Sequence, residues 1–370
     1  MDLNKRIILH ETMQNSKNKE HIYYFDLLRI GALFLVVMLH VAGGALLSGG
    51  GSWRYGWGIA NAFDSLCRCA VPLYVMISGA LFLGRDLSIK QLFTTYVVRI
   101  VRTFIIWSVF YGIVGLLDRI GRHEPFSTWI FVCDCLAGHY HLWFLFMIAG
   151  LYLIVPFLRK IAQNNHLLSL FLVMGFVSAI LIPQSLALVA LFSPAWGTLL
   201  TEIVGKMHVH FFLGYSEYFM FGYWLHKRHL SDNFVCSCGV LGILGIVVTC
   251  LLVAFETKSR GGFYGTYYAE SNLNVFFPAA AVFVICKRIL TKLKGDSRFG
   301  HFIAGLAQYS FGAYLIHAFI FERLGKDFHL WGLAFHPLGA IPVTSLVTFV
   351  LSLGAAILLS QFPFLKKWCM

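Results

Sequence analysis

Two side chains that hydrocarbon disfavours lie within the first long apolar stretch of the chain, residues 23–47. Arg29 and His40 would lie about 16 Å apart along a helix that rises 1.5 Å per residue. Steps of ~100° per residue bring position 40 to within about 20° of position 29, so one helix face carries both side chains. Ionisable residues inside a membrane span predict a functional site. The alternative is structural: Arg29 extends to the near membrane surface, and His40 hydrogen-bonds a neighbouring helix.

A second polar group follows a helical spacing within residues 58–83: Asn61, Asp64, Ser65 and Arg68. This stretch and the first run in opposite directions. A rise of 1.5 Å per residue then places Asp64 and His40 about 9 and 10 Å from the same membrane face. These depths predict a shared cavity. A buried ion pair between Asp64 and Arg68 is the structural alternative, and it does not exclude a role in the site.

Two further histidines are predicted in the outer half of the membrane. His141 opens the fourth apolar stretch, with Trp143 close behind it. His317 lies about 21 Å from the cytoplasmic end of the ninth stretch. A single histidine in a membrane helix usually hydrogen-bonds another helix. The common depth of His40, His141 and His317 instead favours a reactive site.

Two arginines mark the opposite, cytoplasmic half of the membrane. Arg99 and Arg102 are three residues apart, so they share a helix face and could bind phosphate groups. The alternative is ordinary positive charge beside a membrane, which the spacing taken alone favours.

The composition predicts the elements that must position these residues. The chain has 370 residues, of which 58% are hydrophobic and 12% charged, and its mean hydropathy is +0.74. Apolar stretches long enough to cross a bilayer recur throughout, which excludes a soluble domain. The expected fold class is all-α: a polytopic integral membrane protein with about ten transmembrane helices in one bundle. The expected spans are 23–47, 58–83, 91–117, 141–160, 167–190, 208–226, 233–254, 272–290, 303–324 and 340–364.

The distribution of positive charge predicts the orientation. With the N-terminus inside, about 19 lysines and arginines fall on the cytoplasmic side and about 7 outside, as the positive-inside rule requires. Residues 1–22 and 365–370 are then cytoplasmic tails, and residues 23–364 form the membrane domain. The same bias explains the net charge of +12, so membrane lipid is an expected partner and nucleic acid is not.

No metal is expected. Three pairs of cysteines have one residue between them, and their thiols would point about 200° apart on a helix. That spacing forms neither a disulfide nor a zinc site. The chain also lacks H-E-x-x-H, P-loop and G-x-S-x-G motifs.

Four stretches, in order, resemble the membrane acyltransferase-3 family. The first is FDLLRIGALFLVVMLH, which carries the family's arginine and histidine. The second is RCAVPLYVMISGALFL at residues 68–83, and the third is the sequence HLWF at residues 141–144. The fourth is SFGAYLIHAFI at residues 310–320. Arg99 and Arg102 match the family's cytoplasmic Arg-x-x-Arg.

The resemblance covers most of the chain, and ten spans is the family's architecture. It is closest to the WecH-like bacterial O-acetyltransferases of surface glycans, a stand-alone type. What it implies is transfer of an acyl group, expected to be acetyl, from cytoplasmic acyl-CoA. The acceptor would be a hydroxyl of a surface glycan or of its lipid-linked precursor, at the inner membrane of the cell.

The resemblance also implies roles for the site residues. His40 would act as the general base, with Asp64 as its orienting partner. Arg68 or His317 would stabilise the oxyanion. Acetyl-CoA is the expected cofactor, and its phosphates would be bound by Arg29, Arg99 and Arg102. The acceptor would be bound by His141 and Trp143. Direct transfer and a covalent acyl group on His40 both stay open, and the oligomeric state is not predicted.

A proton-coupled transporter or exporter is the alternative function. In that case His40, Asp64, Arg68 and His317 would form a proton or substrate path. Transporters often have two related halves and broken helices, and the sequence indicates neither clearly. A transporter would leave a thioester intact, which separates the two hypotheses.

Overall fold

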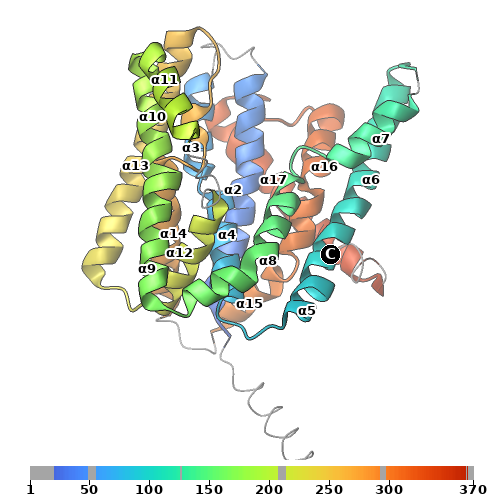
Figure 1. Ribbon diagram of the computed structural model, residues 1–370. Helices are drawn as coiled ribbons and strands as arrows, with labels where there is room; N and C mark the ends of the chain where they lie inside the picture. Colours follow the sequence, from blue (N-terminus) through green and yellow to red (C-terminus); the bar gives the residue numbers. More distant parts are fainter. Residues whose placement is uncertain are drawn as a thin grey trace, which may run out of the picture.

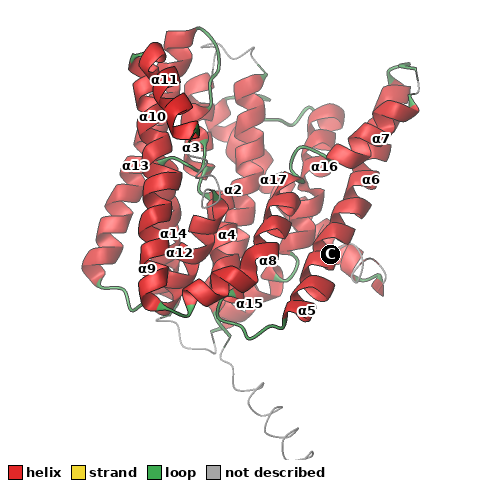
Figure 2. Cartoon of the chain, viewed as in Figure 1, coloured by secondary structure: helices red, strands yellow, loops and turns green. Residues whose placement is uncertain are grey.

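The computed structural model describes residues 21–48, 56–125, 127–206, 214–291, 297–363 and 365. Within these ranges every regular element is a helix and none is a strand, as Figure 2 shows. The predicted all-α class is therefore confirmed. Nearly all of the two predicted tails, at 1–22 and 365–370, lie outside the described residues.

Eight segments of the described chain are long and apolar enough to cross a membrane. A ninth is obtained if α15 (Arg298–Ala307) and α16 (Ser310–Phe328), which are bent by 58° at the break between them, form one span. The eight segments are α2 (Tyr23–Leu47); α3 (Trp57–Cys67) with α4 (Ala70–Phe82); α5 (Ile89–Gln91), η1 (Leu92–Val97) and α6 (Val98–Gly121); α8 (Trp143–Ala162); α9 (Asn165–Gly175), η2 (Phe176–Leu181) and α10 (Ile182–Phe192); α13 (Asp232–Arg260); η4 (Thr266–Tyr268) with α14 (Leu273–Leu290); and α17 (Pro337–Ser360).

The predicted sixth span, residues 208–226, is not among these segments. Its place is taken by α12 (Tyr215–Lys227), a helix of 13 residues, and residues 207–213 lie outside the described chain. A membrane-spanning helix needs about 20 residues. The count of about ten spans therefore stays a prediction. Two short helices, α7 (Thr128–Ala137) and α11 (Pro194–Gly205), lie at one end of the bundle in Figure 1.

The helix that carries Arg29 and His40 runs through the middle of the bundle (Figure 1). Helix α2 contacts α3, α4, α14, α15, α16 and α17. A helix that is apolar on all sides is buried in a bundle. Arg29 and His40 therefore lie on a helix that has protein neighbours along most of its length. Arg29 lies toward the end where α2 begins, and His40 toward the end where it finishes.

The predicted span 58–83 is divided into two helices at Arg68 and Cys69. Pro72 has no N–H group, so it cannot donate to the carbonyl of Arg68 four residues earlier. The backbone of Arg68 and Cys69 stays in the right-handed helical region, and Leu73 N–H resumes the ladder on Cys69 O at 3.0 Å. The break thus places Arg68 at the end of α3 without turning the chain out of the span.

Helices α4 and α12 approach each other at two glycines. A Cβ atom added to Gly79 would overlap the backbone of Phe219, and one added to Gly222 would overlap the backbone of Met76. The side-chain volume that normally separates two helices is absent at both places. This contact holds α12, and with it Tyr215, against the helix that carries Tyr74.

Replacing Gly79 with alanine is expected to lower the free energy of unfolding by about 1–3 kcal/mol, the cost of overpacking. The added methyl group would meet backbone atoms, which cannot rotate away. Thermal unfolding of the purified protein in detergent measures the effect. Gly150→Ala on α8 is the matched control, because nothing lies within 4 Å of a Cβ atom added there. Equal unfolding temperatures for the two variants would contradict the close contact.

Candidate active site

Three histidines from distant parts of the chain meet inside the bundle. His40 comes from α2, His141 from the turn before α8, and His317 from α16. The rings of His40 and His317 are stacked, with centroids 5.2 Å apart and planes 24° apart. The ring of His141 meets that of His317 edge-on, with centroids 5.0 Å apart. We call these three residues the histidine cluster.

His317 presents a buried nitrogen that has no partner among the described residues. The side chain is fully buried, and its Nδ1 lies 2.5 Å from the carbonyl oxygen of Tyr314. A carbonyl oxygen only accepts, so Nδ1 carries the proton and donates. In the neutral ring Nε2 is then a lone-pair acceptor, and this atom is buried without a hydrogen bond. His317 therefore offers a proton-accepting atom inside the site.

His40 is half-buried and lines a cavity of about 160 Å³. It forms no hydrogen bond with any described residue, and its ring contacts are with His317 and Tyr140, the latter at 5.1 Å. An imidazole without internal hydrogen bonds can turn either nitrogen toward a bound hydroxyl group. The cavity gives that hydroxyl a place to lie.

The ring of His141 is held on several sides. Its Nε2 lies 3.3 Å from the carbonyl oxygen of Leu315, and its own carbonyl accepts from the Tyr314 hydroxyl. Its Nδ1 lies 3.0 Å from Nδ1 of His139. His141 also lines the cavity of His40, so its position suits contact with a substrate, but its nitrogens are already engaged.

Glu322 belongs to this network and is absent from the predicted set. Its Oε1 lies 3.0 Å from Nε2 of His139, whose ring stacks on Tyr111 with centroids 4.2 Å apart. A carboxylate on one nitrogen fixes the orientation of an imidazole, and here it fixes the ring that contacts His141. Only the position of Glu322, five residues after His317 on the same helix, could have indicated it.

Asp64 and Arg68 form a buried ion pair, the structural alternative named for them. Arg68 Nε lies 2.5 Å from Asp64 Oδ1, and the Asp64 side chain is fully buried. No hydrogen bond joins Asp64 to His40 among the described residues, so the structure does not orient His40 through Asp64. Arg68 lines the cavity of His40, and its guanidinium lies 3.9 Å from the ring centroid of Tyr268.

The remaining wall of the 160 Å³ cavity is aromatic and acidic. Trp143 lines it, as does Tyr215, and their ring centroids are 5.9 Å apart. Glu270 lines it as well. Tyr215 and Glu270 are not in the predicted set, because nothing in their sequence context ties them to Trp143. We call this space the histidine cavity.

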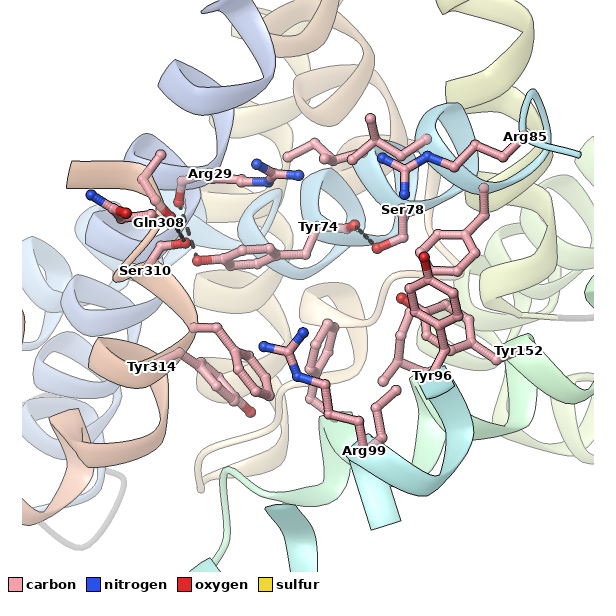
Figure 3. A pocket seen from close by; sticks show the side chains of 18 residues that line it. Arg29, Tyr74, Ser78, Arg85, Tyr96, Arg99, Tyr152, Gln308, Ser310 and Tyr314 are labelled. Atoms are coloured by element: carbon pink, nitrogen blue, oxygen red, sulfur yellow. Dashed lines mark hydrogen bonds between the residues drawn. The ribbon is translucent and has the colours of Figure 1, made fainter. Parts of the chain in front are cut away.

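A larger cavity of about 410 Å³ lies toward the beginning of α2 (Figure 3). Arg29 from α2, Arg85 from the turn after α4, and Arg99 from α6 all line it. Arg102, although it lies near the face of Arg99, does not line this cavity. Arg85 lines the cavity, although its position in the sequence suggests only a charged loop residue. We call this space the arginine cavity.

The two cavities share part of their lining. Tyr74, Phe144 and Tyr314 belong to both. One space is thus lined by three permanent cations and the other by two members of the histidine cluster, with one layer of aromatic side chains between them. Such an arrangement can bind an anionic molecule on one side and carry out proton transfer on the other.

Among the described residues, no group of three or more histidine, cysteine or acidic side chains is placed to hold a metal ion. The chemistry that these residues can perform directly is acid–base catalysis and anion binding.

The all-helical bundle, with its many apolar spans and its buried polar site, is that of a multi-pass membrane protein. A family model described as an acyltransferase domain matches residues 22–361. The chain belongs to the acyltransferase-3 family and is a membrane acyltransferase. No curated protein and no solved structure matches the chain.

Proposed function

We propose that the protein transfers an acyl group from cytoplasmic acyl-CoA to a hydroxyl of a surface glycan or its lipid-linked precursor. The acyl group that we propose is acetyl. The observation that carries the proposal is the junction of the arginine cavity and the histidine cavity at one aromatic layer. The WecH-like subgroup and the inner membrane, with both termini in the cytoplasm, belong to the same proposal.

The arginine cavity suits the donor. CoA carries several phosphate charges, and guanidinium groups bind phosphate through paired, charge-assisted hydrogen bonds. Arg29, Arg85 and Arg99 converge on this cavity from three elements (Figure 3). The cavity lies toward the beginning of α2, the end that the distribution of positive charge assigns to the cytoplasm.

The histidine cavity suits the reaction. The acceptor oxygen would form a bond to the acyl carbon as the carbon–sulfur bond breaks, and an imidazole would take the hydroxyl proton. That proton would pass to the departing sulfur, which leaves as the free thiol of CoA. His40 faces the cavity and is the proposed base, with the unpartnered Nε2 of His317 beside it. Arg68 is the proposed donor to the oxyanion.

The acceptor would bind among the aromatic side chains of the histidine cavity. Trp143 and Tyr215 offer ring faces, and Glu270 offers a carboxylate that accepts from hydroxyl groups. A sugar ring has both apolar faces and many hydroxyls, so it matches both features. Trp143 is 44% exposed and marks the side from which the acceptor would enter.

Inverted membrane vesicles test the proposal. They would receive labelled acetyl-CoA outside and would enclose crude surface glycan in the lumen, and label in the glycan and free thiol would both be measured. We expect the two to rise together in vesicles that contain the protein and not in vesicles that lack it. Intact thioester with every donor and acceptor tried would exclude the acyltransferase function of this site.

Two structural observations favour the transporter alternative. The span at α3 and α4 is interrupted, and the α15–α16 pair is bent by 58°, as membrane segments of transporters often are. The same vesicles decide between the two functions. Proton movement coupled to a solute without release of CoA would support transport.

Replacing Arg99 with alanine is expected to raise the KM for acetyl-CoA roughly 10- to 100-fold, because one hydrogen bond to a charged group is lost. The kcat at saturating donor should change little, since Arg99 lies in the arginine cavity, away from the histidine cluster. Arg122→Ala is the matched control, because Arg122 is exposed and pairs with Glu124 instead. An unchanged KM in the Arg99 variant would remove Arg99 from donor binding.

A further inference from the structure

The partition between the two cavities is a single layer of three aromatic side chains. Phe144 lies in the middle, with its ring centroid 5.9 Å from that of Tyr74 and 5.6 Å from that of Tyr314. All three line both cavities. The arginine cavity and the histidine cavity therefore adjoin at these three side chains.

The two outer members of the layer are held by hydrogen bonds, and Phe144 between them is held by packing. The Tyr74 hydroxyl donates to the carbonyl oxygen of Arg29 at 3.1 Å, and the Tyr314 hydroxyl donates to the carbonyl oxygen of His141. Each tyrosine is thus tied to the backbone of a neighbouring element. Phe144 has no side-chain polar atom, and its ring packs against both tyrosines and against the buried core. Its bulk is therefore the part of the layer that a substitution can remove without breaking a hydrogen bond.

The position of Phe144 determines which acyl groups can pass from the arginine cavity to the histidine cavity. On the proposed function, the acyl carbon must pass from the side of the arginines to the side of His40 and His317. An acetyl group adds only one methyl group beyond that carbon, whereas a longer chain needs continuous room where the ring now stands. The histidine cavity has a volume of about 160 Å³ and the arginine cavity about 410 Å³, so the histidine cavity has less room for a long acyl chain.

We infer that Phe144, held between Tyr74 and Tyr314, restricts the acyl donor to short acyl groups and so determines donor specificity. The inference rests on the proposed acyl transfer and names the class of donor that this site accepts. The reaction itself is the same for any chain length: the carbon–sulfur bond breaks, a carbon–oxygen bond forms, and the hydroxyl proton leaves with the thiol of CoA.

The test compares acetyl-CoA with hexanoyl-CoA as donors for Phe144→Ala, Phe144→Leu and the wild type in the vesicle assay. The ratio of kcat/KM for hexanoyl to that for acetyl should rise about tenfold or more in Phe144→Ala, because extra methylene groups gain room. Phe144→Leu keeps a bulky apolar side chain, so it should fold even if Phe144→Ala does not. It should give a smaller rise in the ratio. Phe157→Ala on the same helix is the matched control, since Phe157 is 72% exposed and should leave the ratio unchanged.

A ratio equal to that of the wild type in both Phe144 variants, with acetyl transfer still measurable, would overturn the inference and leave the proposed function intact. A rise in Phe157→Ala as large as in Phe144→Ala would also overturn it, because the effect would then not come from the aromatic layer. No acetyl transfer by the wild type would overturn the proposed function, and the inference with it.

Discussion

Replacing His40 or His317 with alanine is expected to reduce acyl transfer roughly 100- to 10,000-fold, the range that general acid–base catalysis contributes. His40 faces the histidine cavity without a hydrogen bond to any described residue. His317 stacks on it and holds a buried, unpartnered Nε2. His40 is thus the ring that can meet a bound acceptor, and His317 is the buried ring stacked on it, outside the cavity lining. The loss should appear in kcat with little change in the KM for acetyl-CoA, because the donor phosphates lie in the other cavity.

A double variant separates a shared role from two independent ones. If the two rings act as one proton-accepting unit, His40→Ala with His317→Ala should be little worse than the more severe single variant, because effects within a catalytic unit are not additive. His166→Ala is the control, since His166 is exposed near the start of α9. Full transfer in both single variants would remove the histidine cluster from the chemistry.

Replacing Asp64 with alanine is expected to lower the free energy of unfolding by about 3–5 kcal/mol, the cost of breaking a buried ion pair by removing one partner. Asp64 is fully buried, and its Oδ1 is the recorded partner of Arg68 Nε. Without it the guanidinium keeps its charge and its aromatic neighbour Tyr268 but loses the carboxylate. Thermal unfolding in detergent measures the loss.

Two comparisons make that result specific. Asp232→Ala breaks an ion pair with Arg288 that is largely exposed, and it should change the unfolding temperature little. Asp64→Ala combined with Arg68→Met removes both charges and should recover much of the stability. A double variant as unstable as Asp64→Ala alone would show that the lost stability comes from packing and not from an unpaired charge.

Much of this fold was predictable because the bilayer imposes simple rules on a sequence. Long apolar stretches predict helices, and Arg29 and His40 stand out within the apolar sequence of α2. The division of span 58–83 at Arg68 follows from Pro72, which the sequence displays, but the sequence does not say whether a proline kinks a span or divides it. The short α12 was predicted as a full span because its apolar residues continue the pattern of a membrane helix.

The site was only partly predictable because its contacts join distant segments. His40 and His317 could be placed at one depth by counting residues, but their stacking is a tertiary contact. Glu322 carries no signal that distinguishes it from other residues of its helix, and the HLWF stretch that contains Phe144 does not indicate that its ring lines two cavities. Arg102 shares the motif of Arg99 but does not line the arginine cavity, so its role in binding the donor stays a prediction. A spacing rule states which residues share a face and says nothing about which cavity that face meets.

The most direct test of acyl transfer between the two cavities is a sidedness measurement in sealed, inverted vesicles that contain the purified protein. Labelled acetyl-CoA would be supplied only outside, and glycan acceptor would be enclosed inside. We predict labelled glycan within the lumen and free CoA outside, in equal amounts, with His40→Ala vesicles producing neither. Label that appears only on glycan added outside, or a lumen that stays unlabelled while the same protein releases CoA, would contradict transfer from the arginine cavity to the histidine cavity across the membrane.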